Sequence, residues 1–312
     1  MSASVFFKSF CSTLLMGADE HRTLEDAGSR VTRLLNSTFR AIPSDRENTL
    51  WIGASGRRTL LAGDMRLEIC HLFPWPLFDH YKQRQNGIRE LMNEIRRRLV
   101  AGFGLTSISM DGPITIRFDN GCTVQLLVAF DLGSNGSFCC PDAASSDWPT
   151  RRLMSEITAF DNCDLACNGN LRDLARMSHL WRNTHGIDLD DEQLDTLAYH
   201  FIREWEFRGN STAYYGWMCS DFFRWMERFA PCSGRLPAPC GRRVVHFDTG
   251  YLAHAQRSRK LAMEGNSLFG NGQTDAGAHC FQQIFGFTSM EQLHEDDEAA
   301  VALIAARLMN VH

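Results

Sequence analysis

The sequence predicts an α+β fold in which a mixed sheet with flanking helices precedes an α-helical lobe. Residues 18–40 place apolar side chains on one face of a helix. The segments 114–118 and 123–130 have strand composition, and the Asn-Gly turn between them accepts the positive φ angles of a tight hairpin. After about residue 150 the apolar spacing becomes helical. We therefore expect a sheet-containing lobe over 1–150 and an α-helical lobe over 151–312.

The other elements are predicted from the same patterns. Residues 50–52 are a short apolar entry into a Gly-rich loop, and residues 67–73 have the composition of a strand that ends at Pro74. Residues 85–101 form a second amphipathic helix, and residues 131–150 are expected to be irregular because Gly, Ser, Asp and Pro dominate there. We expect further helices at 168–184, 190–207, 211–230, 250–264 and near 289–310. The aromatic residues between 205 and 225 recur at helical spacing, which predicts core packing rather than a base-stacking surface.

The composition is that of a soluble globular protein, with 44% hydrophobic and 22% charged residues in 312. A net charge of −5 does not favour general nucleic-acid binding. No apolar run approaches the roughly 20 residues that span a membrane, and residues 1–16 do not have the pattern of a secretory signal. We expect a cytoplasmic protein without a membrane partner.

The cysteines favour reduced thiols. The chain has eleven, an odd number, without a CxxC pair. A zinc site is an alternative, although its spacing is poor. Its ligands would be Cys139, Cys140, Cys163 and Cys167.

The most informative segment is a loop of small residues followed by a partly acidic strand. The loop covers residues 53–59, and Asp64, Met65 and Arg66 come after it. Two divalent cations about 3.5–4 Å apart need several carboxylates, and alternate residues of a strand place two of them on one face, about 6.6 Å apart. Here Arg66 stands where the second acid of an Asp-x-Asp pair would be. The segment has the layout of a two-metal site, but the second of its two paired acids is replaced by arginine.

The remaining acids do not restore such a site. Asp64, Arg66 and Glu68 would share one face of the strand, but Asp64 and Glu68 would be about 13 Å apart. The Arg66 guanidinium cannot lose its proton and should pair with Asp64. On the neighbouring strand the position for a third acid holds Gln125, whose amide is an uncharged and weak ligand. A simple salt bridge at the strand edge, without function, is the alternative interpretation of Asp64 and Arg66.

The loop is a candidate phosphate cradle, because backbone N–H groups and cations both attract phosphate. Its candidate nucleotide-binding residues are Gly53, Ser55, Gly56, Arg57 and Thr59, with Arg58 beside them. A Gly-rich turn that binds nothing remains an alternative. The basic run Arg96-Arg97-Arg98 is either a solvated helix face or a contact for phosphate or nucleic acid.

The order of these segments resembles the bacterial CD-NTases, the cGAS/DncV-like nucleotidyltransferases of the SMODS type in anti-phage signalling. The family pattern Gly-Ser-x-x-Arg-Gly-Thr is similar to residues 53–59, Ser-Asp-Ile-Asp to residues 63–66, and Phe-Glu-Val-Val-Pro-Ala-Phe to residues 124–130. Further similar segments lie in the helical half. They are Pro141-Asp142, Cys167-Asn168-Gly169-Asn170-Leu171, Arg176-Met177 with Trp181, Leu194 to Tyr199, Tyr214-Tyr215, Asp221-Phe222-Phe223 and Cys232-Ser233-Gly234. The resemblance covers about residues 30–287.

The departures from the family pattern fall on the chemistry. They are Ala54, Arg58, Arg66, Gln125 and His179, the last in place of a lysine that would touch phosphate. A buried core histidine is the alternative for His179. The resemblance implies a polymerase-beta-like nucleotidyltransferase sheet in 1–150 and, in 151–312, a helical lobe that closes the nucleotide cleft.

The resemblance leaves three functions open. In the first, the chain is a pseudoenzyme of CBASS-type antiviral defence that binds a nucleoside triphosphate, a nucleotide signal or a protein partner, with Asp64 as a remnant of the metal site. In the second, an active synthase uses Asp64 with Glu68 or Asp119 and Mg²⁺ to make a cyclic or linear oligonucleotide messenger. In the third, the chain is a structural subunit that pairs with an active homologous nucleotidyltransferase. Mg²⁺ is expected if the site is active, and otherwise no cofactor.

Overall fold

The computed structural model describes residues 2–109, 113–133, 136–143, 145–229, 234–241 and 243–287. The chain divides into two compact units. The sheet unit comprises residues 16–58 and 63–159. The helical unit comprises residues 1–15 and 59–62 together with the chain from residue 160 onward. Among the residues described, no helix is long and apolar enough to cross a membrane.

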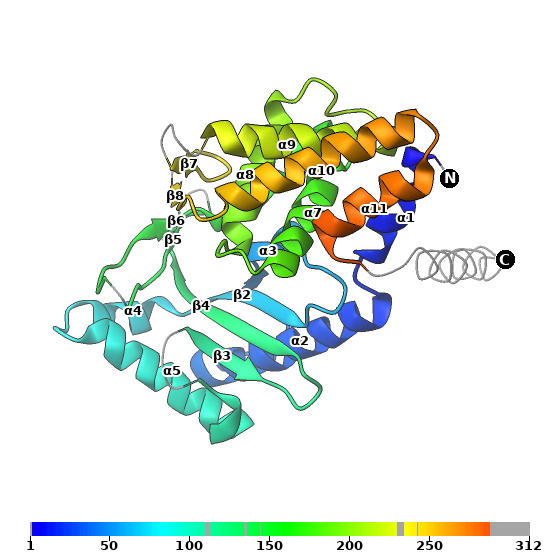
Figure 1. Ribbon diagram of the computed structural model, residues 1–312. Helices are drawn as coiled ribbons and strands as arrows, with labels where there is room; N and C mark the ends of the chain where they lie inside the picture. Colours follow the sequence, from blue (N-terminus) through cyan, green and yellow to red (C-terminus); the bar gives the residue numbers. More distant parts are fainter. Residues whose placement is uncertain are drawn as a thin grey trace. The chain divides into compact units, whose positions relative to one another are not determined.

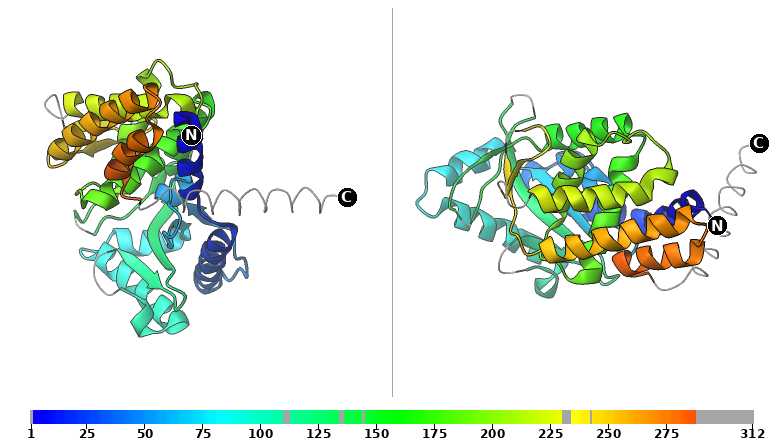
Figure 2. Two further views of the ribbon diagram at one scale, coloured as in Figure 1. Left: turned by 45° about the vertical axis from the view of Figure 1, so that its right-hand side comes forward. Right: turned by 45° about the horizontal axis from the view of Figure 1, so that its top comes forward.

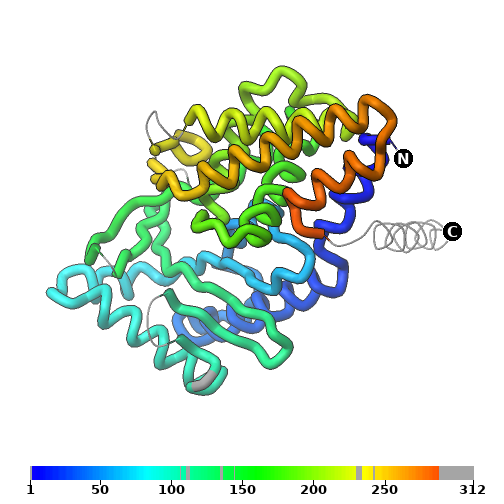
Figure 3. The backbone as a smooth tube through the Cα atoms, viewed as in Figure 1, coloured from blue at the N-terminus to red at the C-terminus, as the bar shows by residue number. Residues whose placement is uncertain are grey.

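The sheet unit contains a mixed sheet and the helices that flank it (Figure 1). Its helices are α2 (Ala18–Arg40), α3 (Gly53–Arg57), α4 (Trp75–Lys82), α5 (Gly87–Phe103) and the first half of α6 (Leu153–Ala166), with a 3-10 turn at Leu105–Ser107. Its strands are β1 (Thr49–Trp51), β2 (Arg66–Leu72), β3 (Ile114–Arg117), β4 (Thr123–Asp131), β5 (Phe138–Cys139) and β6 (Thr150–Arg151). Strand β2 pairs with β4 in parallel, and the other pairings are antiparallel. The tube in Figure 3 traces the β3–β4 hairpin.

One face of this sheet is apolar and is covered by helices. The register places Leu67 beside Val124, and Val124 opposite Ile116, so that the three side chains share a face. All three are fully buried. Helix α2 contacts β2 and β4, and α5 contacts β3 (Figure 1). At Gly28 of α2 an added Cβ would lie 2.8 Å from the Leu67 side chain, so the helix can approach this closely because it has glycine there.

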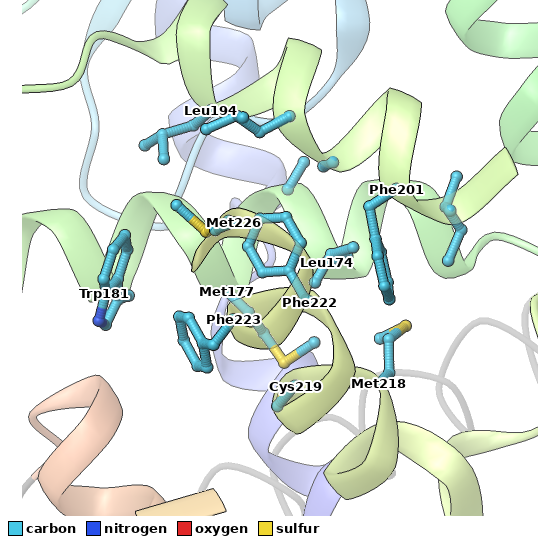
Figure 4. Packing of buried hydrophobic residues seen from close by; sticks show 14 of the residues in the cluster. Leu174, Met177, Trp181, Leu194, Phe201, Met218, Cys219, Phe222, Phe223 and Met226 are labelled. Carbon is cyan, nitrogen blue, oxygen red and sulfur yellow. The ribbon is translucent and has the colours of Figure 1, made fainter. Parts of the chain in front are cut away.

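The helical unit is built around one apolar cluster (Figure 4). Its helices are α1 (Ala3–Thr13), the second half of α6, α7 (Asn170–His185), α8 (Asp191–Glu204), α9 (Tyr215–Phe229), α10 (Leu252–Gly270) and α11 (Thr274–Phe285), with a 3-10 turn at Thr212–Tyr214. A small hairpin of β7 (Arg235–Pro237) and β8 (Val244–His246) completes it. Helices α9 and α10 lie side by side in both views of Figure 2.

Most of the expected elements are confirmed. The helices expected at 18–40 and 85–101 are α2 and α5, and the three expected strands are β2, β3 and β4. The helices expected between 168 and 264 are α7, α8, α9 and α10. The helix expected near 289–310 lies outside the described residues.

Several expectations were wrong or incomplete. Residues 53–57 are the short helix α3 and not a loop, and the stretch 131–150 contains β5 and the start of β6. Helices α1, α4, α6 and α11 had not been expected. Of the aromatic residues between 205 and 225, four are buried as expected and Trp225 is partly buried, but Phe207, Tyr214 and Trp217 are exposed.

The compact units differ from the expected lobes at the N-terminus. Helix α1 belongs to the helical unit although it begins the chain. Its residues Phe6, Phe7 and Phe10 are fully buried in the apolar cluster of that unit. Packing of these rings, rather than position in the sequence, therefore decides where α1 belongs. The expected functional roles of the two lobes stay predictions.

Replacing Phe7 with alanine should destabilise the helical unit by about 3–5 kcal/mol, because a fully buried aromatic ring leaves a cavity. The Phe7 ring contacts Phe281 with centroids 4.8 Å apart and Tyr215 with centroids 6.0 Å apart. Urea unfolding measures the effect. Val5→Ala on the same helix is the matched control, since Val5 is 51% exposed, and it should change stability by no more than about 0.5 kcal/mol. Equal losses in the two variants would show that α1 is not part of this core.

Candidate functional site

The Asp64 carboxylate is held by Arg66. One Asp64 oxygen, Oδ1, accepts the Arg66 backbone N–H at 3.2 Å, and the other, Oδ2, accepts a guanidinium N–H at 3.3 Å. Both side chains are about one-third exposed. The salt bridge expected from the sequence is therefore present. It places a permanent positive charge against the one remaining acid of the Asp-x-Asp pattern.

The next acid along the strand, Glu68, is tied to the start of α3. Its Oε2 accepts the backbone N–H of Ala54 at 2.9 Å. At Gly53, where φ is +59°, an added Cβ would lie 1.6 Å from the same oxygen. Glycine at this position thus lets the carboxylate reach the helix N-terminus. A negative group of the chain itself occupies the place where a helix N-terminus would attract phosphate.

Ser55 connects α3 to the backbone of β2. Its hydroxyl accepts the Glu68 backbone N–H at 3.0 Å and donates to the Arg66 carbonyl at 3.4 Å. The residue is 5% exposed. Gly56 allows the same close approach on the other side of the helix, because an added Cβ would lie 2.5 Å from the Trp51 carbonyl oxygen. Ser55 and Gly56, both expected to bind nucleotide, therefore fix α3 within the sheet unit.

Gln125 lies in the register beside Glu68 rather than beside Arg66. Strand β2 pairs Glu68 with Gln125 and Arg66 with Thr123. These four side chains alternate with the apolar residues that face α2 and α5, so they point to the opposite face of the sheet. The structure thus brings Arg66, Glu68 and Gln125 onto one face, as expected, and Asp64 precedes the strand.

The rest of the expected phosphate cradle is distributed between the two units. Arg57 is 5% exposed in the sheet unit, and Arg58 is exposed and ends α3 in the left-handed conformation. Thr59 belongs to the helical unit, where its hydroxyl donates to Asp195 Oδ2 at 3.0 Å. Thr59 is fully buried. Its hydroxyl is therefore engaged within the protein.

His179 takes part in the same buried polar network of the helical unit. Its Nε2 lies 3.0 Å from Asp195 Oδ1, and its Nδ1 lies 4.0 Å from Asp191. Arg182 contacts Asp191 in turn, at 2.5 Å. His179 is 2% exposed, which is the arrangement of a core histidine. A contact between His179 and phosphate stays a prediction.

Sequence reasoning did not find two contacts of this arrangement. Asp195 is 136 residues from Thr59 along the chain, and no local pattern connects them. The capping of α3 by Glu68 was also missed, because residues 53–57 were expected to be a loop. If residues 53–57 had been expected to form a helix, a carboxylate near Gly53 would have been expected too, because helix N-termini attract negative charge.

The residues present do not fit a pair of Mg²⁺ ions. Across the described part of the chain, no group of three or more His, Cys, Asp or Glu side chains could hold a metal ion. This also counts against the zinc alternative. All ten cysteines that the structure describes are free thiols, and burial raises the pKa of Cys140 to about 12.

The basic run on α5 has two kinds of residue. Arg97 and Arg98 form ion pairs with Glu94 at 2.7 and 2.9 Å, and both are largely exposed. They fit the interpretation as a solvated helix face. Arg96 differs, because it is 9% exposed.

A family model described as the Second Messenger Oligonucleotide or Dinucleotide Synthetase domain (SMODS) matches residues 1–163, which is more than half of the 312 residues. No curated protein matches the chain. Several solved structures do. CdnC of Escherichia coli MS115-1, in a complex with HORMA-deltaN, has a TM-score of 0.67 at 11% identity, and the match covers 93% of this chain and 99% of that one. The GTP-bound form of Vibrio cholerae DncV has a TM-score of 0.66 at 9% identity, with 94% and 97% covered. A STING-associated CdnE c-di-GMP synthase from Capnocytophaga granulosa has a TM-score of 0.64 at 11% identity, with 85% and 86% covered.

These likenesses confirm the fold class. The chain has the α+β fold of a polymerase-beta-like nucleotidyltransferase, with a mixed sheet, flanking helices and a C-terminal helical lobe. At about 10% identity they concern the fold alone.

Replacing Ser55 with alanine should destabilise the protein by about 1–3 kcal/mol, because the part-buried N–H of Glu68 then loses its acceptor. Chemical denaturation measures the loss. Ser37→Ala is the control, since Ser37 is exposed on α2 and its hydroxyl donates to the Arg33 carbonyl of its own helix. Its effect should stay within about 0.5 kcal/mol. Equal stability of the two variants would mean that Ser55 does not hold α3 to β2.

Because His71 on β2 is buried, the free energy of unfolding should decrease as the pH is lowered. Burial, and secondly the charge of Arg40, lowers the pKa of His71 from 6.5 to about 3. The imidazole is therefore neutral in the folded protein, where it contacts the Thr49 hydroxyl at 2.7 Å. Between pH 6.5 and 3 the unfolded chain binds the proton more readily, so stability should fall with acid by up to about 1.4 kcal/mol per pH unit from this group.

Unfolding free energies measured across this pH range test the assignment. His71→Gln should remove the contribution, whereas His80→Gln, at an exposed position of α4, should keep it. If the two variants show the same pH slope, the slope does not come from His71.

Proposed function

Because this chain belongs to the SMODS family of bacterial cGAS/DncV-like CD-NTases, we propose that it is a pseudoenzyme of that family. It has kept the nucleotidyltransferase fold and has lost the metal-dependent chemistry. In this proposal it binds a nucleotide, a nucleotide signal or a protein partner, and it acts in CBASS-type antiviral defence in the cytoplasm.

The observation that carries the proposal is the Arg66–Asp64 pair. Asp64 accepts both an N–H of the guanidinium and the backbone N–H of Arg66. A cation arriving at Asp64 would meet a fixed positive charge, and two unit charges 4 Å apart interact by about 4 kcal/mol at an effective dielectric constant of 20. That figure falls for groups that are one-third exposed, as these are. Even so, the charge has the wrong sign for binding Mg²⁺.

The residues that a rearranged active site would recruit support the same proposal. Glu68 already accepts the Ala54 N–H at 2.9 Å. Asp119 lies exposed in the turn of the β3–β4 hairpin. Gln125, at the position of the third acid, carries no charge. An active synthase would have to break the contact of Glu68 or bring in Asp119 from the turn.

Solved relatives suggest what such a protein would bind. One DncV structure contains GTP, and the CdnC structure contains HORMA-deltaN. By analogy, a nucleoside triphosphate and a protein are the two candidate partners of this chain. An active homologue that pairs with this chain as a structural subunit would be such a protein partner.

The decisive experiment measures metal-dependent product from nucleoside triphosphates with Mg²⁺ and with Mn²⁺. We expect none from the natural chain. The double variant Arg66→Asp, Gln125→Glu should give product, because it removes the guanidinium and adds two carboxylates on the face that holds Glu68.

The same double variant with Asp64→Ala is the control, and it should be inactive again. Product from the natural chain that disappears in its own Asp64→Ala variant would overturn the proposal. It would show that Asp64 works with other ligands. Product from neither the natural chain nor the double variant, with both folded, would mean that more than the acids has been lost.

A further inference from the structure

Helix α5 places a stripe of polar and basic residues next to its apolar face. Arg89, Met92, Asn93 and Arg96 succeed one another at i, i+3, i+4 and i+7, so they lie on one side of the helix. Arg96, the last of them, is 9% exposed. An arginine is rarely buried to this extent unless acids or a ligand compensate its charge.

This stripe lines two cavities of the sheet unit that share part of their lining. One has a volume of about 510 Å³ and the other about 430 Å³. They share Arg89, Met92, Arg96 and Ala143. We call the two together the α5 cavity. Each part has the size of the cavities that bind small molecules in other proteins.

The lining of the α5 cavity has an excess of positive charge. Four arginines line it, namely Arg84, Arg89, Arg96 and Arg151. Asp142 is the acid of the lining, and Glu90 binds Arg84 from outside it at 2.6 Å. Within the lining itself, four arginines therefore stand against one acid. Guanidinium groups in such a setting recognise phosphate or carboxylate groups by paired hydrogen bonds.

Apolar side chains form part of the remaining walls. Ile114, Leu126 and Val128 of the sheet line the larger cavity together with Met92, and Trp148 lines the smaller one. Ile114, Leu126 and Val128 alternate with Gln125 along the paired strands, so their side chains are on the sheet face opposite Gln125 and Arg66. The α5 cavity is therefore separate from the candidate site at Asp64.

We propose that the α5 cavity binds a small molecule that carries phosphate groups beside an aromatic or apolar part. The arginines hold the phosphates, and Trp148 with the aliphatic wall accepts the uncharged part. This site does not depend on the proposed function, because it uses none of the residues around Asp64.

Titration calorimetry of the full chain with ATP and with tripolyphosphate, in a buffer that contains a chelator, tests the site. ATP supplies both parts of the ligand, and tripolyphosphate supplies the anion alone. The variant Arg89→Gln, Arg151→Gln should weaken ATP binding about tenfold for each arginine removed, because each loses a charge-assisted hydrogen bond. Both residues are less buried than Arg96, which favours folding of the variant.

The matched control is Arg22→Gln, Arg98→Gln, which removes the same net charge from exposed positions outside the cavity. It should change ATP affinity less than about threefold, in the range expected for screened surface charge. Tripolyphosphate should bind more weakly than ATP.

Three results would overturn the proposal. The first is that the natural chain binds neither probe. The second is that the cavity variant and the control lose the same affinity, since that would be a nonspecific charge effect. The third is that ATP binds but is unaffected by the cavity variant, which would place ATP elsewhere and leave the pseudoenzyme proposal untouched. If tripolyphosphate bound as tightly as ATP, the proposed binding of an aromatic or apolar part by Trp148 and the aliphatic wall would be contradicted.

Discussion

The pairing of Arg66 with Asp64 is the constraint on which the chemistry of this site depends. A divalent cation and a guanidinium both neutralise a carboxylate, but they differ in the chemistry that they support. A metal ion exchanges its ligands and can polarise a phosphoryl oxygen. A guanidinium stays protonated and offers only N–H donors in a fixed plane. The Arg66 side chain therefore satisfies the charge of Asp64 and supplies none of the Lewis acidity that nucleotidyl transfer needs.

The polar residues near Asp64 in the sequence make structural contacts within the protein. Glu68 caps α3, Ser55 bonds to the backbone of β2, and Thr59 bonds to Asp195 inside the helical unit. Each of these bonds satisfies a group that is buried or partly buried, so each adds to stability where it is formed. A ligand that needed the same groups would have to replace these contacts. In the segment 53–59, the hydroxyl groups of Ser55 and Thr59 are therefore engaged in contacts within the protein.

The sequence was sufficient for the elements with clear periodicity and insufficient for contacts between distant residues. Strand β2 is followed by Pro74, β3 and β4 flank an Asn-Gly turn, and α2 has a well-defined apolar face, so each was found from local pattern. Helix α3 is too short to have a periodic signal. Helix α6 was missed because its apolar residues, from Leu153 to Ala166, are not gathered on one face. The salt bridge of Asp64 was predictable because Arg66 is two residues away. The contact of Thr59 with Asp195 was not, because it depends on how the helical unit packs.

The distribution of charge in the sheet unit shows where an anion would still be favoured. At the start of α3 the available N–H of Ala54 already binds a carboxylate of the chain, so a phosphate there would displace Glu68 and meet its repulsion. On the other face of the sheet, the α5 cavity has arginines in excess over acids and an aromatic wall. Arginines gathered around one cavity repel each other, and this repulsion costs stability unless negative charge offsets it. Electrostatics therefore favours an anion in the α5 cavity over one at the start of α3.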